Sequence, residues 1–483
     1  MKKFWLLSVF AFAALAGTAV WFGGLNQDEG WCLYASRMVA EGRMPYRDFA
    51  YTQGPLMPVV YSVFNRVWDS WGILGARILT LLMGAVSLVF AVGLTRKVCP
   101  PSCREFAPVA VFMLLGCNLY HLYYIAIPKT YALAGMFLMI GFYLLALAED
   151  RRRFMAPAAA ALAFAAGTRI SLGAVLAVVG VSLLSRRRWS DAFAFAAGGL
   201  VALAVVYGPF LLDDAARQGL VDAQRYHAAR GGGDIVWTVG SLSRLVRWYL
   251  PVFILFGMGF TVKTSAFVRV VGLSFAAVFA VQMLAPFPYE DYQVPIMPLL
   301  AVFSTVKFAS SCRSVPLSAS RPALLVLGLS FACAFSNPLL EKWTTNAQDR
   351  FWTRKKEKSE LAQLREVAAR IEALDPGGKE LLTQDLYLAV ETSRRVPRGL
   401  EMGPFAVLDD VQWRNLLENT TCPVAALSGY TFAVEPPRCD ERPVEKQLEY
   451  WNILKKRYRL VAREEDFGQN ATTLLLLERS KTE

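Results

Sequence analysis

Residues 27–56, "QDEGWCLYASRMVAEGRMPYRDFAYTQGPL", follow the first hydrophobic segment of the chain and open with two adjacent carboxylates, Asp28 and Glu29. Charged groups are costly at the edge of a bilayer, so a pair of acids there needs a reason. The same stretch holds a third acid, Asp48, and aromatic side chains that include Tyr51. A loop with this mixture of charge and aromatic residues is typical of a functional surface rather than a simple connector.

The rest of the chain is strongly apolar. Of its 483 residues 55% are hydrophobic and 19% charged, with a mean hydropathy of +0.35. Soluble domains are about a quarter charged and lack repeated apolar runs of about 20 residues. The pattern predicts an α-helical polytopic membrane protein with about eleven transmembrane helices. The expected spans are residues 4–22, 72–95, 107–127, 130–148, 154–166, 170–185, 192–212, 249–262, 266–286, 294–308 and 323–338.

The first segment, residues 1–22, also fits a cleaved signal peptide, because Lys2 and Lys3 precede an apolar run that ends in small residues. Its apolar run is longer than a usual signal core, which favours a retained helix. In either case the following loop, residues 23–71, faces outward.

Basic residues set the orientation of the spans. They gather in alternate loops, as cytoplasmic loops do, whereas most acids before Pro338 fall in the opposite loops. The basic positions are Arg96, Lys97, Arg104, Arg151–Arg153, Arg186–Arg188, Lys263, Lys307, Arg313 and Arg321. We therefore expect a multi-pass protein of a bacterial inner (plasma) membrane with a cytoplasmic N-terminus. The net charge of +12 belongs to this membrane part, since residues 339–483 carry 23 Lys and Arg against 24 Asp and Glu. The lipid bilayer is a sufficient partner for that charge, and no nucleic acid is expected.

After Pro338 the composition becomes globular. The expected domains are a transmembrane module, residues 1–338, and a soluble extracytoplasmic α/β domain, residues 339–483. Apolar residues at helical spacing predict a helix over residues 350–374, ended by "DPGG" (375–378), and "ELLTQD" (380–385) and "TTLLLLER" (472–479) predict strands. Whether Cys422 and Cys439 form a disulfide is left open.

The first outer loop begins with an expected short helix. Trp31, Tyr34 and Met38 form one apolar stripe, which indicates a helix lying in the plane of the membrane interface. Asp28 at its start has a simple alternative role as the N-cap. A cap needs only one carboxylate, however, and does not explain the rest of the loop.

The Asp28–Glu29 pair, followed by the "GRMPYRDFAYTQGPL" portion of the loop, resembles the GT-C superfamily of polyprenyl-phosphate-sugar-dependent glycosyltransferases. The protein O-mannosyltransferases and the lipid A aminoarabinose transferases belong to it. The resemblance also covers the span pattern and the outer domain. It implies inverting transfer of a sugar from a polyprenyl-phosphate donor to an acceptor hydroxyl, with Asp28 as general base. Glu29 would orient Asp28, or contact a metal or a sugar hydroxyl.

The leaving phosphate requires positive charge. Arg169, Lys129 and Arg77 stand where the outer ends of spans are expected, and Arg169 separates two short apolar segments. Each side chain could instead snorkel to the lipid headgroups, and Arg77 could pair with an acid of the first loop.

Contacts to the sugar or the acceptor are predicted for Asp48, Tyr51, Glu290, Asp291 and Tyr292. The alternative for residues 290–292 is an interfacial aromatic belt with solvated acids. His121 and His227 are the only histidines, so a histidine-based triad is not expected, and His121 should be hydrogen-bonded within the helical bundle.

No cofactor is required by the pattern, although metal use varies in this superfamily and Mg²⁺ or Mn²⁺ is left open. The sugar and the acceptor, which could be a lipid, a glycan or a protein, also stay open. The alternative function is a non-enzymatic lipid-carrier flippase or secondary transporter, or a protein that only binds the lipid-linked sugar. A transporter would favour charges midway along the spans and duplicated halves, whereas here the acids gather on one side and no duplication is evident.

Overall fold

The computed structural model describes residues 2–229, 235–259, 261–311, 358–406, 408–428 and 444–480. Contacts divide the chain into two compact units. The first, here called the helical unit, comprises Met1–Val20, Thr52–Met57 and Ile78–Leu340. The second, here called the α/β unit, comprises Trp21–Tyr51, Pro58–Arg77 and Glu341–Glu483. Most of the first outer loop, which the sequence grouped with the membrane module, therefore packs with the C-terminal part of the chain.

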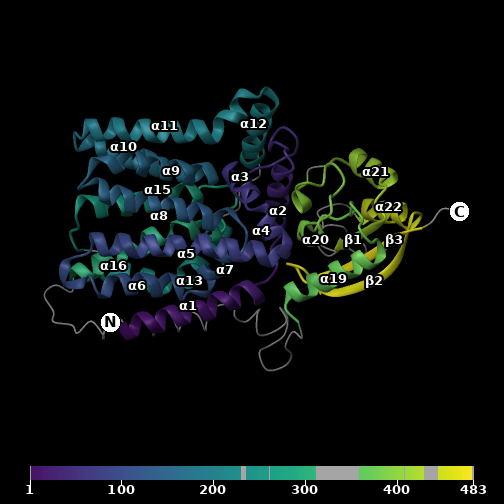
Figure 1. Cartoon of the computed structure of the whole chain (residues 1–483), viewed down its shortest axis with the longest axis horizontal. Coiled ribbons are helices and arrows are strands. Elements are labelled where there is room, and N and C mark those ends of the chain that lie inside the picture. Colours follow the sequence, from purple (N-terminus) through teal and green to yellow (C-terminus); the bar gives the residue numbers. More distant parts are fainter. Residues whose placement is uncertain are drawn as a thin grey trace. The chain divides into compact units, whose positions relative to one another are not determined.

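Long apolar helices build the helical unit, and Figure 1 shows α8, α9, α10, α11 and α15 running side by side. Its helices are α1 (Lys2–Phe22), α5 (Gly72–Val98), α6 (Phe106–Gly116), α7 (Leu119–Ala126), α8 (Thr130–Ala148), α9 (Met155–Thr168), α10 (Gly173–Ser185), α11 (Trp189–Leu212), α12 (Asp214–Ala229), α13 (Ile235–Trp248), α14 (Leu250–Met258), α15 (Ala266–Met283) and α16 (Met297–Ser311). Helices α1 and α5 each have their last or first residues in the α/β unit.

Within the described residues, six helices are long and apolar enough to cross a membrane, and two bent helix pairs raise the number to eight. The pairs are α6 with α7, bent by 69°, and α13 with α14, bent by 84°. The chain is thus a multi-pass membrane protein, but the predicted count of eleven is not confirmed. The expected span 323–338 lies outside the described residues, and the expected span 249–262 is only the short helix α14.

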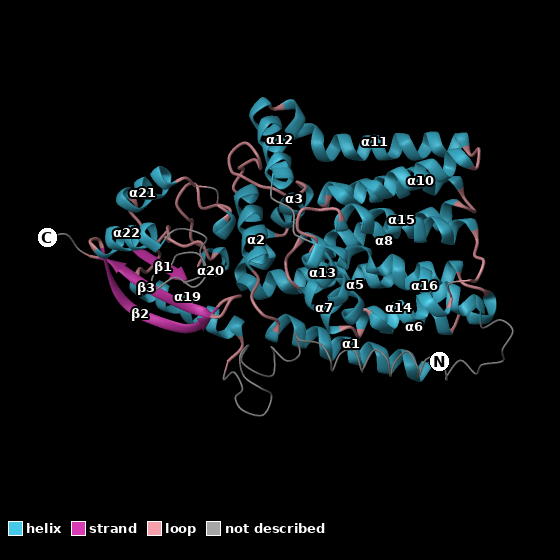
Figure 2. Cartoon of the chain, turned by 180° about the vertical axis from the view of Figure 1, so that it is seen from behind, coloured by secondary structure: helices cyan, strands magenta, loops and turns pink. Residues whose placement is uncertain are grey.

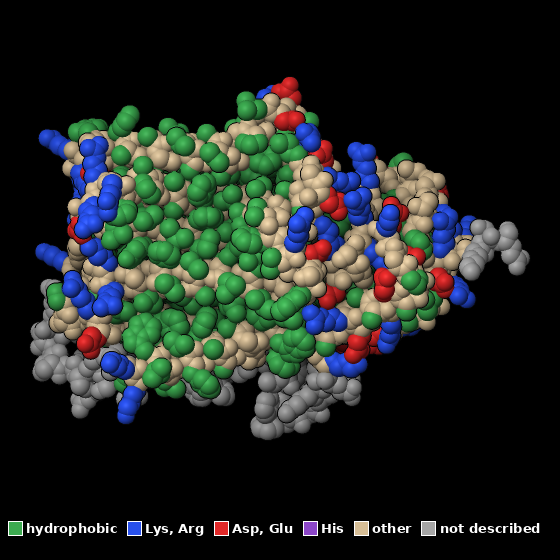
Figure 3. Space-filling view, in the orientation of Figure 1, with side chains coloured by type: hydrophobic (Ala, Val, Ile, Leu, Met, Phe, Trp, Pro, Cys, Tyr) green, Lys and Arg blue, Asp and Glu red, His purple; other side chains and the backbone are tan. Residues whose placement is uncertain are grey.

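The basic loops of the helical unit meet at one of its ends. Lys97 after α5 pairs with Asp150 after α8, and Arg188 before α11 pairs with Glu149. Figure 3 shows Lys and Arg side chains gathered at this end and a broad hydrophobic face beside them. A broad apolar side that stops at a charged end is the surface expected of a membrane-embedded bundle.

The α/β unit contains a three-stranded antiparallel sheet in the order β1-β3-β2, shown in Figure 2. The leucines Leu474–Leu477 of the central strand are all buried, which explains the continuous apolar run in "TTLLLLER". The elements are α2 (Gln27–Ala40), α3 (Leu56–Val63), α4 (Asn65–Trp68), α19 (Glu360–Leu374), α20 (Leu386–Glu391), α21 (Asp410–Asn419), β1 (Val424–Ser428), α22 (Val444–Lys455), β2 (Tyr458–Phe467) and β3 (Thr472–Arg479).

Two predictions for the C-terminal part were right and one was wrong. Strand β3 is the predicted "TTLLLLER", and α19 ends at Leu374, directly before "DPGG", although it begins at Glu360 with Ser359 as its N-cap. "ELLTQD" is not a strand, because only isolated bridges form there, one of them between Leu382 and Ala425. The hydroxyl of Thr383 then accepts a hydrogen bond from the backbone of Asp385 and turns the chain into α20. Cys439 lies outside the described residues, so its pairing with Cys422 stays open.

The predicted interfacial helix exists as α2, but its predicted environment was wrong. Nearly every side chain of α2 is buried within the α/β unit, not only one stripe. The hydroxyl of Tyr34 accepts a hydrogen bond from the backbone of Val396, and the Arg37 guanidinium donates to the carbonyls of Ala389 and Val390. Contacts with the C-terminal part of the chain thus replace the expected contact with lipid.

Candidate functional site

The two acids at the start of α2, Asp28 and Glu29, lie in different environments. Asn26 is the N-cap and accepts a hydrogen bond from the backbone of Asp28, while Glu29 accepts one from the backbone of Asn26 and completes a capping box. The N-cap role considered for Asp28 is therefore wrong. Asp28 stands half-buried in the first helical turn, where the helix dipole favours a negative charge.

Glu29 is enclosed together with Arg77. Both side chains have no solvent exposure, and Arg77 donates to Glu29 from Nε at 2.9 Å and from Nη2 at 2.6 Å. Arg77 also donates to the carbonyls of Gly23 and Gly24. The alternative that Arg77 pairs with an acid of the first loop is the one that the structure shows. All three nitrogens of the Arg77 guanidinium therefore donate hydrogen bonds to groups inside the protein.

Asp48 and Tyr51 lie in the same unit as Asp28. Asp48 closes a turn by accepting hydrogen bonds from the backbone of Met44 and from Arg47, and the bond from Arg47 holds the pKa of Asp48 below its usual range. The Tyr51 ring is buried beside Trp31, at 5.1 Å between ring centroids. Burial raises the pKa of the Tyr51 hydroxyl well above its usual range, and the charge of Asp28 adds to this rise.

In the helical unit, Lys129 and Asp291 come together from distant parts of the sequence. Lys129 follows Pro128 and stands at the N-cap position of α8, without a side-chain cap for that helix. Its Nζ lies 3.0 Å from Oδ2 of Asp291, which also accepts a hydrogen bond of 2.9 Å from the hydroxyl of Tyr131. The side chains of Lys129 and Asp291 are only 8% and 13% exposed. Asp291 is therefore not a solvated acid.

Arg169 lies in the same cluster, where the chain is extended between α9 and the 3₁₀ turn Ile170–Leu172. Its guanidinium carbon lies 4.7 Å from the ring centroid of Tyr131 and 5.2 Å from that of Tyr292, and its Nη1 donates to the hydroxyl of Thr130. The Nε of Arg169 is buried and has no hydrogen-bond partner among the described residues. A buried donor in this state costs about 1–3 kcal/mol until an acceptor reaches it.

The cluster is consequently suited to an anion. We use the name cation cluster for Lys129, Arg169, Asp291, Tyr131 and Tyr292. It holds two cations against one carboxylate, and the N-terminus of α8, whose free N–H groups favour negative charge, lies within it.

Two neighbouring features support the cluster. Glu290 accepts hydrogen bonds from Ser241 and from both Nε and Nη2 of Arg244, which ties its 3₁₀ helix (Glu290–Ile296) to α13. Gly54 packs against the end of α9: a Cβ there would stand 2.3 Å from the carbonyl oxygen of Gly167. His121 is hydrogen-bonded to Tyr249, as predicted.

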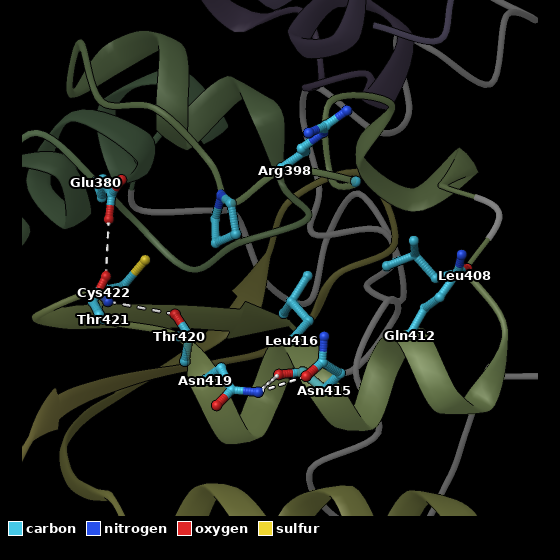
Figure 4. A pocket seen from close by; sticks show the side chains of 12 residues that line it. Glu380, Arg398, Leu408, Gln412, Asn415, Leu416, Asn419, Thr420, Thr421 and Cys422 are labelled. Carbon is cyan, nitrogen blue, oxygen red and sulfur yellow. Dashed lines mark hydrogen bonds between the residues drawn. The ribbon is translucent and has the colours of Figure 1, made fainter.

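No motif in the sequence indicates the pocket of Figure 4, which lies in the α/β unit and has a volume of about 490 Å³. Helix α21 contributes the amides of Gln412, Asn415 and Asn419, and the hydroxyls come from Thr420 and Thr421. Glu380 and Arg398 also line the pocket, so it presents charged as well as uncharged hydrogen-bonding groups. Within the described parts of the chain, no group of three or more His, Cys, Asp or Glu could hold a metal ion.

Comparison with known proteins gives a match at the level of structure. No protein-family model and no curated protein sequence matches the chain. The chain is similar to the crystal structure of ArnT from Cupriavidus metallidurans bound to undecaprenyl phosphate, with a TM-score of 0.63 and 16% identity over 97% of both chains. The chain has the GT-C fold. AglB, the oligosaccharyltransferase of Archaeoglobus fulgidus, shares the GT-C fold: its complex with an inhibitory peptide and a dolichol-phosphate gives a TM-score of 0.51 at 9% identity, over 100% of this chain and 75% of AglB. Its apo form gives 0.52.

Proposed function

We propose that this chain is an inverting glycosyltransferase that moves a sugar from a polyprenyl-phosphate donor to an acceptor hydroxyl on the outer face of a bacterial inner membrane. The cation cluster is the observation that carries the proposal, because a lipid phosphate is the anion that this chemistry requires at the end of a membrane helix bundle. Two structural neighbours, ArnT with undecaprenyl phosphate and AglB with dolichol-phosphate, support the choice of donor.

The reaction breaks the bond between the anomeric carbon and the phosphate oxygen. The acceptor oxygen forms the new bond to that carbon from the opposite side, and its proton passes to Asp28 as general base. The bonding electron pair leaves with the polyprenyl phosphate. Attack from the opposite side inverts the anomeric configuration.

In this proposal Arg169 and Lys129 stabilise the charge that develops on the leaving phosphate. Asp291 and Tyr292 act by holding these two cations in position. Glu29 and Arg77, which were predicted as site residues, have a positioning role through their ion pair. Contacts with the sugar or the acceptor remain predictions for Asp48, Tyr51, Glu290, Asp291 and Tyr292. The outward orientation of the α/β unit and a cytoplasmic N-terminus are predictions as well.

Asp28→Asn tests the proposal directly. The purified chain is incubated with a panel of radiolabelled undecaprenyl-phosphate sugars and with a lipid, glycan or peptide acceptor, and released undecaprenyl phosphate is measured. Transfer by Asp28→Asn should fall by at least about a hundredfold, because a positioned base contributes about 10²–10⁴ in rate. Asp214→Asn, which changes an 87% exposed carboxylate, is the matched control and should keep wild-type activity. Transfer by Asp28→Asn at the wild-type rate would refute the base assignment.

The same assay separates the enzyme from a flippase or transporter. Only the enzyme releases carrier phosphate in proportion to glycosylated product, and the product of the proposed reaction has the anomer opposite to that of the donor. Movement of the labelled donor across proteoliposomes without such release would favour the transporter.

A further inference from the structure

The residues that precede Asp28 are held by the C-terminal part of the α/β unit. The backbone N–H of Leu25 donates to Oε2 of Glu360 at 2.7 Å, and the backbone N–H of Gln27 donates to Oε1 of Gln469 at 2.7 Å. These partners lie more than 330 residues along the chain from α2. The residues that lead into α2 are therefore held by side chains from the C-terminal part of the chain.

The side chain of Gln27 enters a buried hydrogen-bond network. Its Nε2 donates to Oδ1 of Asp385 at 2.7 Å and to the hydroxyl of Tyr387 at 3.3 Å, and the same hydroxyl donates to Asp385 at 2.9 Å. Asp385 has no solvent exposure, and Tyr387 and Gln27 are also buried. Hydrogen bonds in such a low-dielectric environment are strong and hold their members in one geometry.

The backbone of α2 is also seated on α20. Gly30 faces the backbone of Tyr387 so closely that a Cβ on it would lie 2.3 Å from the Tyr387 nitrogen. The first turn of α2 thus has a hydrogen-bonded side chain before Asp28 and a close backbone contact after it. Residues before and after Asp28 are thus both held by the segment that contains Asp385 and Tyr387.

We infer that Asp385 and Tyr387 are positioning residues for Asp28, and that the C-terminal part of the chain is needed for the chemistry itself rather than only for access of the acceptor. The inference rests on the proposed function, in which Asp28 is the general base. A shift of about 1 Å in a catalytic group can cost about a hundredfold in rate, so support of this kind has a measurable effect.

Tyr387→Phe and Gln27→Met remove donors from this network without removing volume. Tyr458→Phe is the matched control, because its hydroxyl is equally buried and donates to the carbonyl of Cys422 at 2.7 Å, away from α2. We expect kcat for transfer to fall at least about tenfold in Tyr387→Phe and Gln27→Met, with the donor KM within about twofold of wild type. Tyr458→Phe should lower the melting temperature about as much as Tyr387→Phe and leave kcat unchanged.

A second measurement does not depend on activity. Amide hydrogen exchange in peptides that cover residues 25–31 should be faster in Tyr387→Phe and Gln27→Met and unchanged in Tyr458→Phe. If the wild type transfers no sugar, the proposed function fails, and exchange alone still decides whether the network fixes α2. Unchanged exchange in both variants would overturn the inference. Faster exchange with wild-type kcat would overturn it as well, because α2 would then be held for stability and not for catalysis.

Discussion

Glu29→Gln is the most informative perturbation of the acidic pair, because it separates the two carboxylates that the sequence presents together. Glu29 accepts hydrogen bonds from the backbone of Asn26 at 3.0 Å and from Arg77 Nε at 2.9 Å and Nη2 at 2.6 Å. Glutamine of the same size supplies one acceptor oxygen and turns an NH₂ group toward other donors. Arg77 then keeps a buried positive charge without its anion.

Breaking a buried ion pair by removing one partner costs about 3–5 kcal/mol of folding free energy. At about 2–4 °C per kcal/mol, the usual conversion for a folded unit of 150–250 residues, the apparent melting temperature should fall by about 6–20 °C. Arg77→Met should have a similar effect. The double variant Glu29→Gln with Arg77→Met removes both charges, so it should be no less stable than either single variant.

Differential scanning fluorimetry of the full chain in detergent measures these four proteins. Glu478→Gln is the control, since the Glu478–Arg459 pair lies at the surface, with its arginine 71% exposed, and such pairs contribute about 0–1 kcal/mol. A melting temperature for Glu29→Gln within about 2 °C of wild type, or a double variant whose loss equals the sum of the single losses, would refute the buried-pair reasoning.

Three further predictions concern other parts of the molecule. Arg169→Gln should weaken undecaprenyl phosphate binding by about 10–100-fold, because one charge-assisted hydrogen bond is lost. Arg217→Gln, which changes a half-exposed arginine of α12, should bind the lipid as wild type does. Titration of the lipid in micelles measures both affinities. Gly54→Ala should lower the melting temperature, because its Cβ meets the carbonyl of Gly167; a wild-type value would contradict the packing. Burial raises the pKa of Asp385, so the folded chain holds that proton more tightly than the unfolded chain. Wild type should therefore gain stability relative to Asp385→Asn as the pH falls from about 7 to about 4, and melting curves over that range check the sign.

The parts of the fold that could be predicted are those set by local patterns. Helix α8 has the predicted bounds, residues 130–148, since an uninterrupted apolar run of that length has few alternatives, and "DPGG" ends α19 as its glycines and proline require. The environment of α2 could not be predicted in this way. Its apolar stripe suits lipid and protein equally, and the choice is made by contacts with α20 and its N-cap residue Asp385, which lies 358 residues from Gln27.

The candidate site likewise has features that a local sequence pattern indicates and features that depend on contacts between distant parts of the chain. A local signal was present for the capping box, because Asn26 and Glu29 stand three residues apart in the usual pattern of cap and acid, and it would have separated Glu29 from Asp28. No local signal joins Lys129 to Asp291, which are 162 residues apart, and the sequence could name them only as charges near span ends. Their pairing depends on the packing of the helical unit.

The charged residues of the candidate site differ in whether they have a partner of opposite charge. Glu29 and Arg77 cancel each other inside the α/β unit, and Lys129 is balanced by Asp291 inside the cation cluster. Among the described residues, Arg169 donates a hydrogen bond to the Thr130 hydroxyl, stacks on two aromatic rings and forms no ion pair with a carboxylate. Rings that stack on a guanidinium hold its plane but cannot satisfy its N–H groups. In the proposed function an anion supplies the acceptor that the Arg169 guanidinium lacks, and a lipid phosphate brings both the charge and the oxygens.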